Sequence, residues 1–167
     1  MVKGLWHFSF TVSDLDRSID FYCSLLGMQL RLRQDQNNEY TRKLVGYAEA
    51  NLQVAQLYLT GTSIGPSGHI LELVQFLNPK FSANPPGTAY PNSAHMAFVV
   101  DDIHVEYSRL CQAGVRFRSE PVAIVAGVNR GGASVYFLDP DGITLELLQP
   151  PPQPPRDPSI LIAFEGS

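Results

Sequence analysis

The chain has 167 residues, an ordinary globular composition and a net charge of −4 at pH 7. Its only loose basic group, Arg31, Arg33, Arg42 and Lys43, falls short of the basic face that nucleic-acid binding needs. No apolar run approaches the roughly 20 residues that cross a bilayer, and no secretory signal is recognisable. We therefore expect a cytoplasmic protein without nucleic-acid or membrane partners.

The two cysteines lie far apart in the sequence. Cys23 and Cys111 do not form a Cys-x-x-Cys motif, and both fall at apolar positions of predicted helices. A buried, reduced thiol behaves there as a small hydrophobe. We expect neither a disulfide nor a zinc finger.

Alternating apolar and polar residues predict a first strand over residues 7–12. A helix follows, capped by Ser13 or Asp14 and ended by Gly27. Residues 40–50 are ambiguous between a strand and a short helix. The remaining strands expected in this half cover residues 29–33, 52–59 and 69–76.

The second half repeats this order. A strand begins at His95, a helix capped by Asp101 or Asp102 runs to Gly114, and strands are expected at 115–118, 133–138 and 143–149. Between the last two strands, Asp139-Pro140-Asp141-Gly142 is a strong turn signal, and its carboxylates are interpreted as turn formers.

These elements predict an α+β protein of two tandem βαβββ modules that form a curved, mostly antiparallel sheet around a metal cavity. The N-terminal module covers residues 1–77 and the C-terminal module residues 94–149. The linker between them, residues 78–93, is rich in Pro, Asn, Gly and Ser. The proline-rich tail, residues 150–167, is expected to be extended at its start.

Chemistry-bearing residues recur at matched places of the two halves, which identifies an internal repeat. The motif HFSFTVSDL at 7–15 returns as HMAFVVDDI at 95–103, and ILELVQ at 70–75 returns as TLELLQ at 144–149. Two imidazoles and two carboxylates suit a divalent transition metal. The predicted ligands are His7, Glu72, His95 and Glu146.

Strand geometry supports this interpretation, because alternate side chains share a face. Phe8, Phe10 and Val12 would share the face that packs against the helices, and His7 would lie on the other face. The leucines that flank Glu72 and Glu146 would point away from the carboxylates, which would then face a cavity with the histidines. Taken singly, a strand His or Glu is usually a surface residue or a satisfied polar group, so the repeat carries the prediction. His69, three residues before Glu72, is interpreted as a strand-edge residue on the opposite face, and His104 as exposed on the polar side of its helix.

At these residues the sequence resembles the vicinal oxygen chelate superfamily (glyoxalase, bleomycin resistance and extradiol dioxygenase proteins), and within it bacterial glyoxalase I. The stretches that carry this resemblance are DLDRSIDFY at 14–22, LGM at 26–28 and GTAY at 87–90. The resemblance implies a lyase or isomerase that moves a proton through a metal-stabilised enediolate. It implies nickel, cobalt or zinc, with iron or manganese as alternatives, and Glu146 or else Glu72 as the base.

Two positions depart from the glutathione-dependent members of that family. Those enzymes carry an arginine four residues after the first histidine and an asparagine four residues after the first glutamate, whereas Thr11 and Phe76 stand here. This departure speaks against glutathione as the co-substrate.

Two other functions compete with this one. An extradiol dioxygenase would use two histidines and one glutamate around iron, and Glu72 would crowd that site. A non-catalytic antibiotic-binding protein would have no need of the four ligands. Because each half supplies half of the ligands and an exposed sheet edge, the halves are expected to meet within one chain or across a homodimer, with the dimer preferred.

Overall fold

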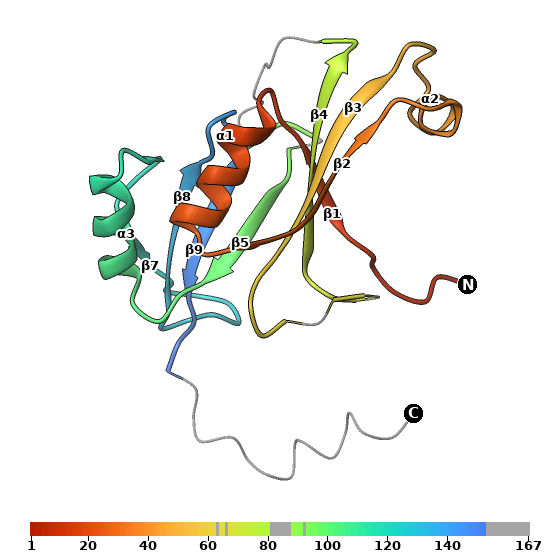
Figure 1. Ribbon diagram of the computed structural model, residues 1–167. Helices are drawn as coiled ribbons and strands as arrows, with labels where there is room; N and C mark the ends of the chain where they lie inside the picture. Colours follow the sequence, from red (N-terminus) through yellow and green to blue (C-terminus); the bar gives the residue numbers. More distant parts are fainter. Residues whose placement is uncertain (63, 66, 81–87, 92, 153–167) are drawn as a thin grey trace. The chain divides into compact units, whose positions relative to one another are not determined.

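The computed structural model describes residues 1–62, 64–65, 67–80, 88–91 and 93–152. Its strands form two sheets (Figure 1). The chain divides into two compact units, and each is described by itself. The first unit comprises Met1–Ser93 with Asp139–Ile143, and the second comprises Ala94–Leu138 with residues from Thr144 onward.

The sheet of the first unit has the strand order β1-β4-β3-β2. Its strands are β1 (Phe8–Thr11), β2 (Gln29–Gln36), β3 (Asn51–Tyr58) and β4 (Ile70–Asn78). The first and last strands pair in parallel, with Ser9 opposite Glu72, and the other pairs are antiparallel. This topology brings the N-terminal motif beside the Leu-Glu-Leu motif of the same unit.

The helix after β1 begins where the sequence predicted. Helix α1 (Leu15–Asp20) continues as the single π-helical turn η1 (Phe21–Leu25). Asp14 is the cap, since its carboxylate accepts a hydrogen bond from the Arg17 amide. Gln75 of β4 accepts a second one from the Leu15 amide, so two of the free N–H groups of this helix end are satisfied.

The ambiguous segment at residues 40–50 is a helix, α2 (Glu39–Val45). Asn38 accepts a hydrogen bond from the Thr41 amide at its start, and Gly46 ends it in the left-handed conformation that favours glycine. This cap and this terminator outweigh the weak strand pattern of the segment.

The sheet of the second unit contains the path β5-β9-β8-β6, with β7 also paired to β8. Its strands are β5 (His95–Val99), β6 (Arg116–Phe117), β7 (Val122–Ala123), β8 (Ala133–Leu138) and β9 (Thr144–Gln149). As in the first unit, the first and last strands in sequence, here β5 and β9, pair in parallel. Helix α3 (Ile103–Gln112) is capped by Asp102, and Gln149 accepts a hydrogen bond from the Ile103 amide as Gln75 does in the first unit.

The predicted α+β class and the mostly antiparallel pairing are confirmed, with one sheet for each repeat. Two burial predictions were wrong. Cys111 is exposed on α3, and Phe8, expected to pack against a helix, is exposed on β1.

No helix in the described ranges is long and apolar enough to cross a membrane. Residues 81–87 and 92 of the expected linker, and the expected tail from residue 153, lie outside the description.

Candidate metal-binding and proton-transfer site

The first predicted pair, His7 and Glu72, comes together within the first unit. His7 directly precedes β1, and the parallel register sets Ser9 beside Glu72 on β4. The His7 Nε2 lies 3.5 Å from the Glu72 Oε1, and the side chains are 33% and 17% exposed. An imidazole therefore faces a mostly buried carboxylate.

The second pair, His95 and Glu146, repeats this arrangement within the second unit. Here Ala97 of β5 stands beside Glu146 of β9. The His95 Nε2 lies 3.2 Å from the Glu146 Oε2, and the side chains are 47% and 15% exposed. The sequence repeat is thus also a repeat of side-chain geometry.

Strand alternation separates each carboxylate from its flanking leucines, as predicted. Leu71, Leu73, Leu145 and Leu147 are buried, whereas both glutamates keep part of their surface exposed. In the first unit, α1 packs against β3 and β4. The leucines hold each strand in its core, and this fixes the face on which its glutamate emerges.

Further polar side chains contact the two glutamates, and the sequence reasoning missed them. Gln56 of β3 donates its amide N–H to the Glu72 Oε2 at 3.0 Å, and Arg31 of β2 donates to the Gln56 Oε1 at 2.9 Å. In the second unit Ser134 of β8 donates to the Glu146 Oε1 at 2.5 Å. Only the cross-strand registers bring these residues to the carboxylates, so the sequence motifs carry no signal for them.

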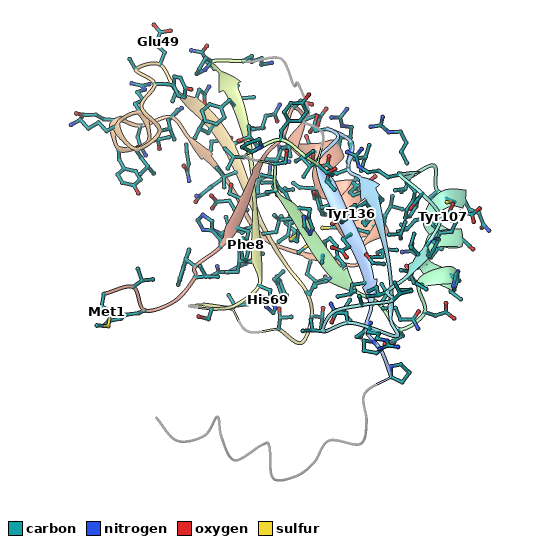
Figure 2. All side chains as sticks on the ribbon, turned by 180° about the vertical axis from the view of Figure 1, so that it is seen from behind. Met1, Phe8, Glu49, His69, Tyr107 and Tyr136 are labelled. Atoms are coloured by element: carbon teal, nitrogen blue, oxygen red, sulfur yellow. The ribbon has the colours of Figure 1, made fainter. Side chains whose placement is uncertain are left out.

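Tyr136 completes the surroundings of the second pair. It stands opposite Glu146 in the β8–β9 register, and its ring meets the His95 ring at a centroid distance of 5.2 Å. Such an edge contact restricts the imidazole orientation. Figure 2 shows Tyr136 on its strand.

The structure brings the predicted ligands together as two pairs, one in each unit. Within the described residues, no group of three or more His, Cys, Asp or Glu side chains could hold a metal ion. The four-ligand set therefore stays a prediction. His69 lies exposed just before β4, at the other end of the β3–β4 pair from Glu49 (Figure 2). His104 on α3 is exposed, as predicted.

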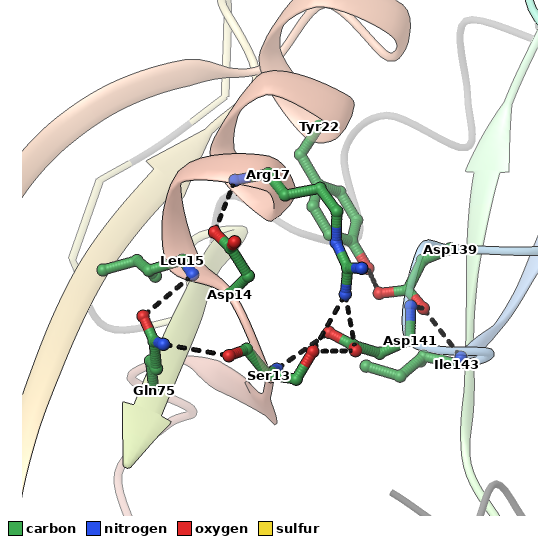
Figure 3. Close-up of polar contacts among 9 residues, drawn as sticks. All are labelled: Ser13, Asp14, Leu15, Arg17, Tyr22, Gln75, Asp139, Asp141 and Ile143. Carbon is green, nitrogen blue, oxygen red and sulfur yellow. Dashed lines mark hydrogen bonds and ion pairs between the residues drawn. The ribbon is translucent and has the colours of Figure 1, made fainter. Parts of the chain in front are cut away.

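A separate polar cluster in the first unit surrounds the turn Asp139–Ile143 (Figure 3). The Asp139 carboxylate accepts hydrogen bonds from the amides of Asp141 and Ile143, so it forms the turn as predicted. Tyr22 also donates to it, at 3.2 Å. Burial is the main cause that raises the pKa of Asp139 and of the Tyr22 phenol.

The cluster extends to the start of α1. Asp141 accepts hydrogen bonds from the Ser13 amide and hydroxyl and pairs with Arg17 at 2.8 Å (Figure 3). The Gln75 amide donates to the Ser13 carbonyl. The carboxylates of Asp139 and Asp141 thus stabilise the turn and its contact with the start of α1, which agrees with the interpretation of this motif as a turn.

The two positions that depart from the glutathione-dependent pattern have different surroundings. Thr11 ends β1 and is exposed, whereas the Phe76 ring packs edge to face on Tyr47 with centroids 6.0 Å apart. Phe76 therefore offers an apolar ring where a hydrogen-bonding amide was expected for glutathione.

Comparison with known proteins places the chain in a family. Residues 4–147 match the Glyoxalase/Bleomycin resistance protein/Dioxygenase superfamily, and the chain belongs to it. It is 35% identical over 150 residues to a 2-epi-5-epi-valiolone epimerase of an Actinomyces species, which covers 87% of this chain and 78% of the relative. This membership confirms the resemblance seen in the motifs.

Two further comparisons agree. A lactoylglutathione lyase of Haemophilus influenzae is 35% identical over 148 residues, covering 86% of this chain and 90% of the relative. A crystal structure of a glyoxalase family protein from Bacillus cereus superposes with a TM-score of 0.76, at 21% identity and with 91% and 97% of the two chains covered. The former supports an enzyme of this superfamily, and the latter supports the fold.

Proposed function

We propose that the protein is a divalent-metal-dependent isomerase, epimerase or lyase that moves a proton between adjacent carbons of a small oxygenated substrate. The observation that carries this proposal is the repeated pair of a histidine Nε2 facing a glutamate carboxylate, at 3.5 Å in one unit and 3.2 Å in the other. The superfamily relatives that are named as epimerase and lyase support the reaction type.

The residues present fit a transition metal such as nickel, cobalt or zinc. Imidazole nitrogen and carboxylate oxygen are ligands that these ions accept. Both carboxylates are more than four-fifths buried, and a buried carboxylate is costly without a compensating cation. We propose His7, Glu72, His95 and Glu146 as the ligands.

Proton transfer is assigned to the carboxylates. A bound divalent metal would act as a Lewis acid toward negative charge that develops on substrate oxygens. We propose Glu146 as the general base and Glu72 as the second choice, because a positioned carboxylate can take a proton from one carbon and return it to the next. The Ser134 hydroxyl would hold Glu146 in place during the transfer.

The substrate is proposed to be a small polyoxygenated compound that is not joined to glutathione. Phe76 presents an apolar ring that cannot replace the hydrogen bonds of an asparagine, and Thr11 carries no charge and cannot form the ion pair of an arginine with the glutamyl group of glutathione. The similarity to a 2-epi-5-epi-valiolone epimerase points the same way. A cytoplasmic homodimer remains part of this proposal.

A deuterium-exchange experiment tests the reaction. The metal content of the purified protein is measured first. The protein is then incubated in D2O with 2-epi-5-epi-valiolone, with methylglyoxal with and without glutathione, and with methylmalonyl-CoA, and loss of the carbon-bound proton is followed by NMR. We expect the wild type to exchange the carbon-bound proton of a substrate when no glutathione is present. The Glu146→Gln variant should catalyse this exchange about 10²–10⁴-fold more slowly.

Glu39→Gln is the matched control, because Glu39 lies exposed on α2 in a surface pair with Lys43. This variant should exchange at the wild-type rate. A protein without bound metal, or unchanged exchange in Glu146→Gln, would overturn the proposal. Oxygen consumption on catechol would favour the dioxygenase instead.

A further inference from the structure

Each proposed ligand carboxylate has its two oxygens in different surroundings. In Glu72, Oε1 faces His7 at 3.5 Å and Oε2 accepts from Gln56 at 3.0 Å. In Glu146, Oε2 faces His95 at 3.2 Å and Oε1 accepts from Ser134 at 2.5 Å. In both units one oxygen is directed at the histidine while the other is hydrogen-bonded from the neighbouring strand.

The orientation of the Gln56 amide is determined by its two neighbours. A guanidinium can only donate hydrogen bonds, so Arg31 selects the amide oxygen, and an ionised carboxylate can only accept, so Glu72 selects the amide nitrogen. The whole Gln56 residue is only 8% exposed. Gln56 is therefore a buried donor held in one orientation from β2 and aimed at Glu72.

Ser134 reaches Glu146 diagonally across the β8–β9 pair. Its backbone partner is Leu148, two residues beyond Glu146, and such diagonal neighbours lie within reach across a sheet. A hydroxyl can donate to the carboxylate while rotating freely to suit it. The second unit thus places a donor on its glutamate from a diagonal position, whereas Gln56 stands directly opposite Glu72 in the β3–β4 register.

We propose that Gln56 and Ser134 are positioning residues for the metal site, an inference that rests on the proposed function. A free carboxylate turns readily about its last torsion and can bind through either oxygen or both. A donor on one oxygen restricts that rotation and leaves the other oxygen, beside the histidine, to bind a metal singly. Groups that orient metal ligands in this way contribute to metal affinity. Arg31 acts one step further out, by orienting Gln56.

Titration of the metal-free full chain with cobalt(II) alone tests the proposal. Calorimetry gives the dissociation constant, the visible absorption bands report the coordination geometry, and urea unfolding of the metal-free variants reports folding. We expect Gln56→Met and Ser134→Ala each to weaken cobalt binding by about 10- to 100-fold and to change the absorption bands. Ser134→Thr, which keeps the hydroxyl, should bind cobalt with an affinity close to that of the wild type.

Two control variants remove side chains of the same kind elsewhere. Gln53 lies on the opposite face of β3 and donates to Asp35, and Ser108 donates to the His104 carbonyl on α3. Gln53→Met and Ser108→Ala should bind cobalt as the wild type does. If Gln56→Met fails to fold, Arg31→Met, altered at an exposed position, should still show a smaller loss of affinity.

The outcomes separate the two proposals. Wild-type affinity and unchanged bands in both Gln56→Met and Ser134→Ala, with a wild type that binds cobalt, would overturn the positioning role and leave the proposed function standing. A wild-type chain that binds no cobalt would overturn the proposed function, and the positioning role with it.

Discussion

Tyr22 and Asp139 form a buried hydrogen bond that anchors the polar cluster of the first unit. The phenol donates to the Asp139 Oδ2, and the same carboxylate shapes its own turn through two backbone amides. Asp139 therefore stabilises the turn through hydrogen bonds within it, and Tyr22, far away in the sequence, adds a hydrogen bond from η1. Two changes at this pair have contrasting, measurable consequences.

Replacing Tyr22 by phenylalanine removes the hydroxyl and leaves the ring in place. A buried acceptor then loses a partner, so we expect the free energy of unfolding to fall by about 1–3 kcal/mol. Urea unfolding measures this loss. Tyr40→Phe, at an exposed tyrosine on α2, should stay within about 0.5 kcal/mol of the wild type, and an equal loss there would contradict the assignment.

Asp139 predicts a pH dependence of definite sign. Burial raises its pKa in the folded state, so the protonated form is favoured there more than in the unfolded chain. The raised pKa therefore contributes to the free energy of unfolding. This contribution is fully present below the pKa of the unfolded chain, about 3.9, and is lost as pH rises through the pKa of the folded state. The stability of the wild type relative to Asp139→Asn should therefore decrease as pH is raised from about 4 toward 7.

Denaturant unfolding of both proteins at each pH measures this difference. Other groups titrate alike in the two proteins and cancel. Asp101→Asn, at an exposed position before α3, serves as the control and should show a flatter difference. A difference that grows in favour of the wild type with rising pH would contradict the assigned direction.

Among the elements, helices α1 and α3 begin in the same way. In each unit an aspartate caps the helix, and a glutamine of the last strand accepts from the first helical amide. The glutamine follows the Leu-Glu-Leu motif in both halves. The repeated LELVQ and LELLQ motifs therefore carry both a proposed metal ligand and a helix cap, on opposite faces of one strand.

Neighbouring aspartates at α3 provide a test with an internal control. Asp102 accepts from the amides of His104 and Val105, so Asp102→Ala should lower the free energy of unfolding by about 0.5–2 kcal/mol. Asp101→Ala, one residue earlier, should change it by less than about 0.5 kcal/mol. Equal losses from the two variants, measured by thermal unfolding, would reject Asp102 as the cap.

Periodicity and turn chemistry predicted most of these elements. Strand β8 has the predicted bounds, and the predicted strands occur in the expected order in both halves, but the two-residue strand β7 was not predicted. The helical nature of residues 39–45 and the choice of Asp102 over Asp101 could not be predicted, because cap geometry decides them. The burial predictions for Cys111 and Phe8 failed for a related reason: spacing identifies a face of an element, but not what covers it.

Part of the candidate site could also be predicted from the sequence. The repeat identified His7, Glu72, His95 and Glu146, and the structure pairs them within their units. Gln56 and Ser134 were not predictable, since their place beside the carboxylates depends on the β3–β4 and β8–β9 registers. Such registers depend on which face each strand buries and on the geometry of the connection between the strands, and the two motifs contain neither partner strand.

For the whole molecule, the proposed metal site predicts stabilisation by metal. An ion that binds only the folded state adds about 2.7 kcal/mol at a free concentration 100-fold above its dissociation constant. Nickel, cobalt or zinc should therefore raise the midpoint of thermal unfolding. The double variant His7→Ala and His95→Ala should lose this rise, while the exposed His104→Ala should retain it. A rise retained by the double variant would exclude these ligands.

The exposed edge of the first sheet bears on assembly. Strand β1 stands at the end of the strand order, and Phe8 on it is exposed. An unpaired apolar edge favours association, so we predict a homodimer. Analytical ultracentrifugation should give twice the mass of one chain, and Phe8→Lys should shift the protein toward a monomer. Val128→Lys, at an exposed valine outside the strands, should not, and a wild type of single-chain mass at all concentrations would contradict the dimer.

The parallel pairing of β1 with β4, and of β5 with β9, has a consequence for the order of events during synthesis. In each unit the histidine stands at the first strand and the glutamate on the last, so the two can meet only after the intervening strands have been synthesised. Pairing of such distant segments is a late and slow step of folding. A nascent or half-folded chain therefore lacks the paired donors, and binding of a metal by all four proposed ligands would require that both units be complete.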